Sequence, residues 1–135
     1  MVCVYCGGET EVLNSRPQQR VNKIWRRRSC RTCLGVFTTI ENIETGYTHL
    51  VKKTSGHLEP FLRDKIFISI YDSCKHRKSA VEDSTALTDT VISSILQQSQ
   101  NGIISTSLLR QTVLSVLQKF DSAASVFYQS YFHDN

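Results

Sequence analysis

The sequence predicts an α+β chain in two parts, a small three-stranded sheet held by a metal ion and a helical bundle that carries a β-hairpin. Two C-x-x-C pairs near the start and the β-forming residues around them predict the first part, and apolar residues at helical spacing predict the second. At 135 residues, the chain suits a small metal module and one domain of about 90 residues. We expect the two parts to be residues 1–45 and residues 46–135.

Four of the five cysteines form the two pairs, Cys3 with Cys6 and Cys30 with Cys33, and 23 residues lie between the pairs. Two thiolates on a tight turn can bind one ion, and two such turns provide the four sulfur ligands of a structural Zn²⁺ site. Disulfides and an iron–sulfur centre are the alternatives, but the odd number of cysteines and the lack of a recognisable signal peptide disfavour disulfides. Four sulfur ligands leave no position for a catalytic water, so we expect the metal to be structural. The fifth cysteine, Cys74, is expected to be a buried small side chain.

The β-forming residues of the first part predict three strands, at residues 10–13, 21–28 and 36–40. Residues 14–19 are polar and include a proline, so we expect a loop there. Three strands in this order, with the cysteine pairs at their ends, form a zinc ribbon, and residues 41–46 are expected to be a linker. A ribbon this small buries too little apolar surface to fold alone, so the metal must contribute to its folding.

The second part is expected to begin with a β-hairpin formed by residues 47–53 and a short strand at Leu58. Pro60 is expected to occupy the first position of a helix that continues to Cys74. Apolar spacing and capping residues predict three more helices, at residues 83–100, after Ser105 or Thr106, and after Asp121 or Ser122. The four helices are expected to form a bundle with the hairpin at one end.

A run of basic residues separates the two cysteine pairs. Between Asn14 and Cys33 there are seven basic residues and no acidic one. On a strand, Arg26 and Arg28 would point to one face and Arg27 to the other. A basic strip of this kind on a metal-bound scaffold indicates nucleic-acid binding, and a solvated basic strand is the alternative.

Net charge alone does not predict strong attraction to nucleic acid. Residues 1–45 carry seven basic and four acidic side chains, and a zinc ion with four thiolates adds a formal charge of about −2. The first part is therefore nearly neutral, so binding depends on where the arginines point. Arg16 adds a cation in the preceding segment, and Trp25 offers a ring that could stack on bases.

In the second part, Lys52 and Lys53 on the hairpin and Lys65 on the next helix could converge on a phosphate, although composition alone also fits solvated charges. We find no glycine-rich phosphate loop, nucleophile elbow or paired carboxylates, so we do not expect an enzyme. No apolar stretch is long enough to span a membrane. Together with the reduced thiols, this predicts a cytoplasmic protein without a membrane partner.

The order of these motifs resembles that of the NrdR family of bacterial transcriptional repressors, in which a zinc ribbon precedes an ATP-cone domain. In the ribbon, the resemblance rests on the two cysteine pairs, Asn14-Ser15-Arg16, Arg26-Arg27-Arg28-Ser29, and Phe37-Thr38-Thr39-Ile40-Glu41. In the ATP-cone, it rests on Val51-Lys52-Lys53, Glu59-Pro60-Phe61, Asp64-Lys65-Ile66 and Arg77. The ATP-cone is a helical bundle with a β-hairpin lid, so the resemblance implies the same fold as the patterns above.

The resemblance implies a nucleoid-associated repressor that binds paired operator boxes in double-stranded DNA upstream of ribonucleotide reductase genes. It implies that ATP or dATP binds the ATP-cone and changes the homo-oligomer, so that DNA binding follows the deoxynucleotide pool. The implied DNA contacts are Arg16, Arg26, Arg27 and Arg28. The implied nucleotide contacts are Val51, Lys52, Lys53, Glu59 and Lys65.

The last expected helix departs from the family's pattern. Ser125, Phe127 and Phe132 stand where the family has a tyrosine, an arginine and another tyrosine. In the family, these positions help to form the nucleotide pocket and the subunit contacts. The alternative function is therefore a zinc-ribbon module that binds protein or RNA and carries a degenerate ATP-cone.

Overall fold

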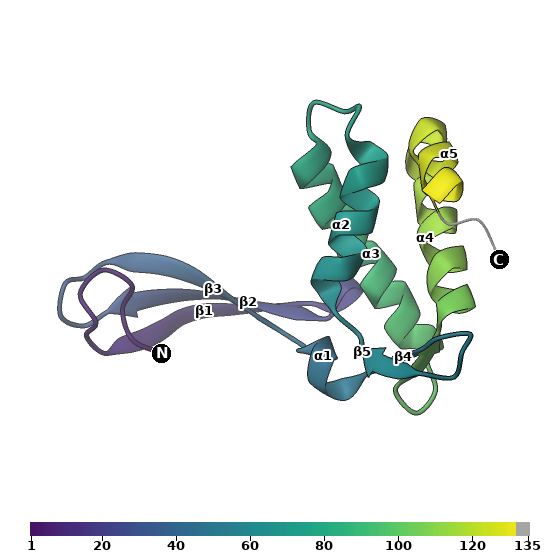
Figure 1. The fold of residues 1–135 in the computed structure, drawn as a ribbon. Coiled ribbons are helices and arrows are strands. Elements are labelled where there is room, and N and C mark those ends of the chain that lie inside the picture. Colours follow the sequence, from purple (N-terminus) through teal and green to yellow (C-terminus); the bar gives the residue numbers. More distant parts are fainter. Residues whose placement is uncertain (132–135) are drawn as a thin grey trace. The chain divides into compact units, whose positions relative to one another are not determined.

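The computed structural model describes residues 1–131, so Phe132 lies outside the described residues. The chain divides into two compact units, Met1–Ile43 and Glu44–Asn135 (Figure 1). Each unit has its own buried cluster of side chains. We therefore describe the two units one after the other.

The first unit is an antiparallel sheet of β1 (Thr10–Gln18), β2 (Lys23–Cys30) and β3 (Val36–Asn42), with β2 in the centre. The prediction of a loop at residues 14–19 is wrong, because β1 continues to Gln18 and pairs with β2. Pro17 is tolerated there because β1 is an edge strand, whose outer side needs no ladder hydrogen bonds. The turn comes later, at the short 3₁₀ helix η1 (Gln19–Val21) and Asn22, which has a left-handed backbone.

The buried cluster of the first unit is very small. It consists of Cys3, Cys30 and Phe37, while several apolar side chains of the sheet, such as Leu13 and Ile40, are more than half exposed. Burial of three side chains does not offset the entropy lost by ordering a unit of this length. A cross-link at the cysteines is therefore needed for this unit to fold.

The second unit contains a three-stranded sheet rather than the expected two-stranded hairpin. Its order is β5 (Leu58–Pro60), β4 (Leu50–Lys52) and β6 (Ile103–Ser105), and β6 runs parallel to β4. A short helix, α1 (Thr45–Thr48), occupies part of the expected linker and first strand. Pro60 ends β5 instead of opening the next helix, because an edge strand accepts a proline as readily as a first helical turn does.

Four longer helices build the bundle, namely α2 (Arg63–Cys74), α3 (Ala80–Gln98), α4 (Thr106–Phe120) and α5 (Ser122–Tyr131) (Figure 1). α3 packs on both α2 and α4, and α5 packs on both α2 and α4. The core between them includes Ile70, Ile95 and Leu117, each fully buried. Cys74 belongs to this core, as expected of a small apolar side chain, and burial raises the pKa of its thiol.

Two of the predicted helix caps are present. The Ser105 hydroxyl accepts a hydrogen bond from the Leu108 backbone N–H at 3.1 Å and caps α4. Asp121 caps α5, since its Oδ1 accepts hydrogen bonds from the N–H groups of Ala123 at 2.9 Å and Ala124 at 3.2 Å.

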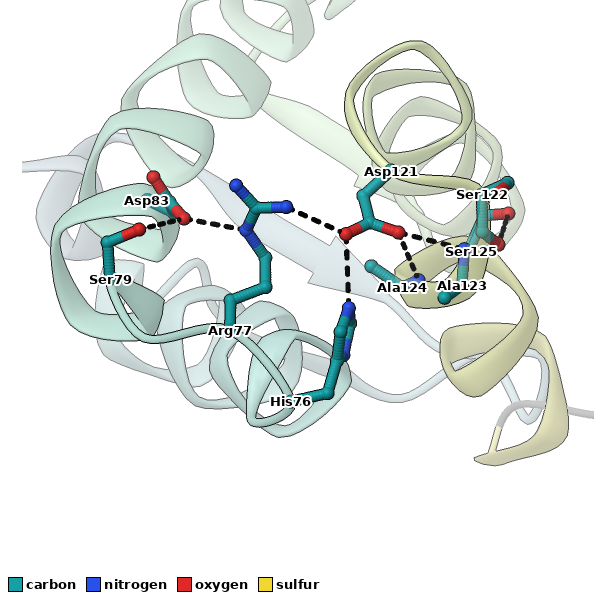
Figure 2. A network of polar contacts seen from close by, with 9 residues as sticks. All are labelled: His76, Arg77, Ser79, Asp83, Asp121, Ser122, Ala123, Ala124 and Ser125. Atoms are coloured by element: carbon teal, nitrogen blue, oxygen red, sulfur yellow. Dashed lines mark hydrogen bonds and ion pairs between the residues drawn. The ribbon is translucent and has the colours of Figure 1, made fainter.

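The other carboxylate oxygen of Asp121 ties α5 to the loop between α2 and α3 (Figure 2). It accepts hydrogen bonds from Arg77 at 2.9 Å and His76 at 3.0 Å. Arg77 also donates to Asp83 at 2.8 Å and lies over the Phe120 ring at 4.5 Å. His76 and Arg77 therefore connect the α2–α3 pair to the α4–α5 pair through polar contacts.

Candidate functional site

The two cysteine pairs lie on turns with the same local structure. In the first turn, the Gly7 N–H donates to the Cys3 carbonyl at 2.9 Å; in the second, the Leu34 N–H donates to the Cys30 carbonyl at 3.1 Å. Gly7 and Leu34 both have a left-handed backbone, with φ of 73° and 60°. Each turn thus folds its two cysteines back toward one point.

The four cysteine sulfurs lie together at that point. The Cys3 and Cys33 sulfurs are 3.6 Å apart, those of Cys6 and Cys30 are 3.5 Å apart, and all four lie within 4.8 Å of one another. A tetrahedral Zn²⁺ with Zn–S bonds of about 2.3 Å sets its sulfurs about 3.8 Å apart, so the cluster fits the ion. The four cysteines form a metal-binding cluster, and Zn²⁺ is its cofactor.

Backbone N–H groups donate hydrogen bonds to two of the four sulfurs. The N–H groups of Cys33 and Thr32 donate to the Cys30 sulfur at 3.4 Å and 3.3 Å, and the Tyr5 N–H donates to the Cys3 sulfur at 3.4 Å. The hydrogen bond from Cys33, with that from Thr32, favours the thiolate and lowers the pKa of Cys30 to about 6. Thiolates are the form that binds zinc.

Two glycines let the turns approach each other. A methyl group on Gly8 would lie 2.6 Å from the Thr32 hydroxyl, and one on Gly35 would lie 2.5 Å from the Tyr5 ring. Tyr5 also contacts Phe37 edge-on, with ring centroids 6.3 Å apart. Tyr5 therefore packs along the second turn.

The strand register distributes the four candidate arginines over two faces of the ribbon. Arg27 pairs with Asn14 on β1, and its neighbour on the same face, Trp25, pairs with Arg16. Arg26 and Arg28 point to the opposite face. The structure therefore places Arg16 and Arg27 together around Trp25, and it does not bring all four arginines to one surface.

The two faces differ in how their cations are neutralised. Arg26 forms an ion pair with Glu41 at 2.9 Å, and Arg28 donates to Thr39 at 3.1 Å. On the other face, Arg27 is exposed and donates to the Thr38 hydroxyl at 3.3 Å. Arg16 lies over the Trp25 ring, 5.8 Å from its centroid.

Two adjoining cavities lie in the second unit, and both are lined by Lys53 and Lys65. The smaller one, of about 110 Å³, is also lined by Val51 and Glu59. The larger one, of about 200 Å³, extends toward α4 and α5. Four of the five candidate nucleotide residues thus line these cavities. Lys52 does not, because it alternates with Val51 on β4 and is exposed.

Glu59 holds the two lysines together. Its Oε1 lies 3.3 Å from the Lys53 amine, and its Oε2 lies 3.3 Å from the Lys65 amine. The hydrogen bond from Lys53, with that from Lys65, lowers the pKa of Glu59, so its carboxylate is charged at neutral pH.

The larger cavity includes residues that we did not predict, namely Ser69, Thr106, Arg110 and Tyr128. Tyr128 is nearly fully buried, and burial raises its pKa to about 12, so the phenol is neutral. Arg110 and Tyr128 lie on α4 and α5, which are distant from the lysines in sequence. No pattern in the sequence marked either residue as part of a site.

No helix within residues 1–131 combines the length and apolar character needed to cross a membrane.

The comparisons with known proteins cover both units. Residues 1–41 match the family model described as the N-terminal domain of transcriptional repressor NrdR-like proteins, a zinc ribbon. Residues 49–135 match the ATP cone domain.

Similar proteins extend along the whole chain. A transcriptional repressor NrdR of Symbiobacterium thermophilum is 34% identical over 99% of this chain and 88% of its own length. Proteins of the same name from Pelobacter propionicus and Fervidobacterium nodosum are 37% and 36% identical over 96% and 99% of this chain, and over 86% and 87% of their own lengths.

Proposed function

Because the chain belongs to the NrdR family of transcriptional repressors, which are not enzymes, we propose that it represses ribonucleotide reductase genes by binding operator boxes in double-stranded DNA. The zinc ribbon is the proposed DNA-binding domain, and the ATP-cone is the proposed nucleotide sensor. ATP or dATP binding in the ATP-cone would control the homo-oligomer and, through it, the affinity for DNA. The proposed site of action is the nucleoid in the bacterial cytoplasm.

The DNA-binding proposal rests on one observation: exposed arginines lie on one face of a sheet that is held together by a metal site. Arg16, Trp25 and Arg27 share this face, which we call the Trp25 face. Cations can meet phosphates or base edges there, and the sheet holds them at fixed spacing. We assign the direct contacts to this face, whereas Arg26 and Arg28 on the opposite face support the ribbon or contact DNA more weakly.

The nucleotide part of the proposal rests on the lysine-lined cavities. The smaller cavity is lined by Val51, Lys53, Glu59 and Lys65, all of which lie within the residues that match the ATP cone domain. A nucleotide can control DNA binding if it favours one assembly and if only that assembly spaces two ribbons to match two operator boxes.

Solution mass measurements test this proposal. The mass of the protein is measured without nucleotide, with ATP and with dATP, each with and without duplex from upstream of the ribonucleotide reductase genes. We expect the mass to depend on the nucleotide, and one nucleotide state to bind the duplex more tightly than the other. The alternative is a zinc-ribbon interaction module with a degenerate ATP-cone. It would be supported if neither nucleotide changed the mass or the DNA affinity and if calorimetry showed no heat of nucleotide binding.

A further inference from the structure

Three cations from three separate elements line the larger cavity. Lys53 directly follows β4, Lys65 lies on α2, and Arg110 lies on α4. Thr106, at the start of α4, also lines the cavity, and its hydroxyl donates to the Lys52 carbonyl at 3.0 Å. A cavity with several cations and few anions favours a ligand that carries several negative charges.

The lining of the two cavities also includes a carboxylate. Among the described residues that line the two cavities, Glu59 is the only carboxylate. It uses both oxygens, one for each lysine, and its side chain is only 23% exposed. Its two oxygens therefore stand where two oxygens of a phosphate chain would stand if the ligand bridged the same lysines.

We propose that Glu59 is an internal counter-anion that occupies the phosphate position until a polyphosphate ligand displaces it, and that Arg110 is the third cation of the same site. This inference rests on the proposed nucleotide binding and deepens it, because it assigns separate roles in that site to Glu59 and Arg110. A triphosphate brings more charge than one carboxylate and offers oxygens to a planar guanidinium as well as to two amines, so it replaces the contacts of Glu59 and adds new ones. The bound ligand then links the end of β4 to α2 and α4.

Calorimetry with inorganic tripolyphosphate tests the role of Glu59, because this probe has no base or sugar. Glu59→Gln keeps the side-chain shape and removes the charge. We therefore expect tripolyphosphate and ATP to bind this variant about threefold to tenfold more tightly than they bind the unchanged protein. Asp64→Asn is the matched control, since it removes the same charge from an exposed position at the start of α2, and we expect little change. Weaker binding by Glu59→Gln would overturn the proposal and make Glu59 a direct ligand.

A second measurement on the unchanged protein makes the test independent of any variant. The ¹³C resonance of the Glu59 carboxylate is followed while tripolyphosphate is added. We expect the chemical shift of this resonance to move toward the value of a solvated carboxylate as tripolyphosphate replaces Glu59 at the two lysines. A resonance that stays in place at saturation would show that the carboxylate is not displaced.

Two substitutions test the role of Arg110, one that removes its positive charge and one that keeps it. We expect Arg110→Gln to weaken tripolyphosphate binding about tenfold or more and Arg110→Lys to retain part of it, while Lys119→Gln, an exposed change on the same helix, has little effect. Equal affinity of Arg110→Gln and the unchanged protein would remove Arg110 from the site. If the unchanged protein binds neither ATP, dATP nor tripolyphosphate, the proposed nucleotide function itself fails, which is a different outcome from these.

Discussion

Arg26 and Arg27 are neighbours in sequence, but the alternation of a β-strand gives them different surroundings. Arg26 shares its face with Glu41, which neutralises it at 2.9 Å. Arg27 shares its face with Trp25 and Arg16 and donates to a neutral hydroxyl, that of Thr38. The charge available to a DNA phosphate is therefore larger at Arg27 than at Arg26.

This difference predicts unequal effects of two similar substitutions. Arg27→Ala is expected to weaken operator binding about tenfold and to lower the slope of log affinity against log salt by about 1. Arg26→Ala is expected to cost less, because its charge is already paired with Glu41. Affinities at several salt concentrations provide the measurement, and Arg20→Ala in the turn before β2 is the control for a lost surface charge. Stronger loss from Arg26→Ala than from Arg27→Ala would place the DNA on the opposite face of the ribbon.

At the scale of elements, Asp121 connects parts of the second unit that are far apart in the sequence. One oxygen caps α5, and the other binds His76 and Arg77 in the loop between α2 and α3 (Figure 2). The hydrogen bonds from His76 and then Arg77 lower the pKa of Asp121 to about 2. The same carboxylate therefore contributes to helix formation and to the packing of the helix pairs.

Removal of this carboxylate is expected to destabilise the second unit and to flatten its response to acid. Asp121→Ala should lower the free energy of unfolding by about 1–2 kcal/mol, as loss of a helix cap does. Because the folded pKa is depressed, the stabilisation is present above the unfolded value of about 3.9 and is lost as pH falls toward 2. Denaturant unfolding of the helices between pH 2 and pH 5 measures both effects. Asp72→Ala, which removes an exposed partner of Lys75, should leave that pH response in place.

At the scale of the whole molecule, the two units depend on different sources of stability. The second unit buries a continuous apolar core that involves its sheet and all four long helices. The first unit buries little besides Cys3, Cys30 and Phe37. Hydrophobic burial therefore stabilises Glu44–Asn135, whereas metal binding stabilises Met1–Ile43.

A strong chelator is accordingly expected to unfold one unit and spare the other. Zinc binding contributes about 10–16 kcal/mol to the folding of small zinc modules, far more than three buried side chains can. In ¹H–¹⁵N spectra, resonances of residues 1–43 should collapse to random-coil positions, while those of residues 44–131 keep their dispersion. DNA binding should be lost in the same titration and return when Zn²⁺ is added. A ribbon that keeps its dispersed resonances without metal would show that its sheet folds without the ion.

Features that depend on nearby residues could be predicted from the sequence. The metal cluster is one, because each pair of cysteines lies on a single tight turn and the spacing alone brings its two sulfurs together. The caps at Ser105 and Asp121 are others, since each side chain bonds to N–H groups two or three residues later. The order of ribbon and bundle followed from the same local patterns.

Errors occurred where a distant partner decided the outcome. Residues 14–19 were expected to form a loop, but pairing with β2 extends β1 through Pro17. The strand β6 was missed because three residues show no periodicity, and it exists only because β4 lies beside it.

By itself, the sequence determined the zinc-binding cysteines, the basic character of the ribbon and the α+β class, because these depend on residue type and short spacing. Tertiary structure alone decided which arginines share a face, that Glu59 bridges Lys53 and Lys65, and that Arg110 lines the same cavity. Strand register and helix packing bring these residues together from segments that the chain separates by up to several tens of residues, and no local pattern records such contacts.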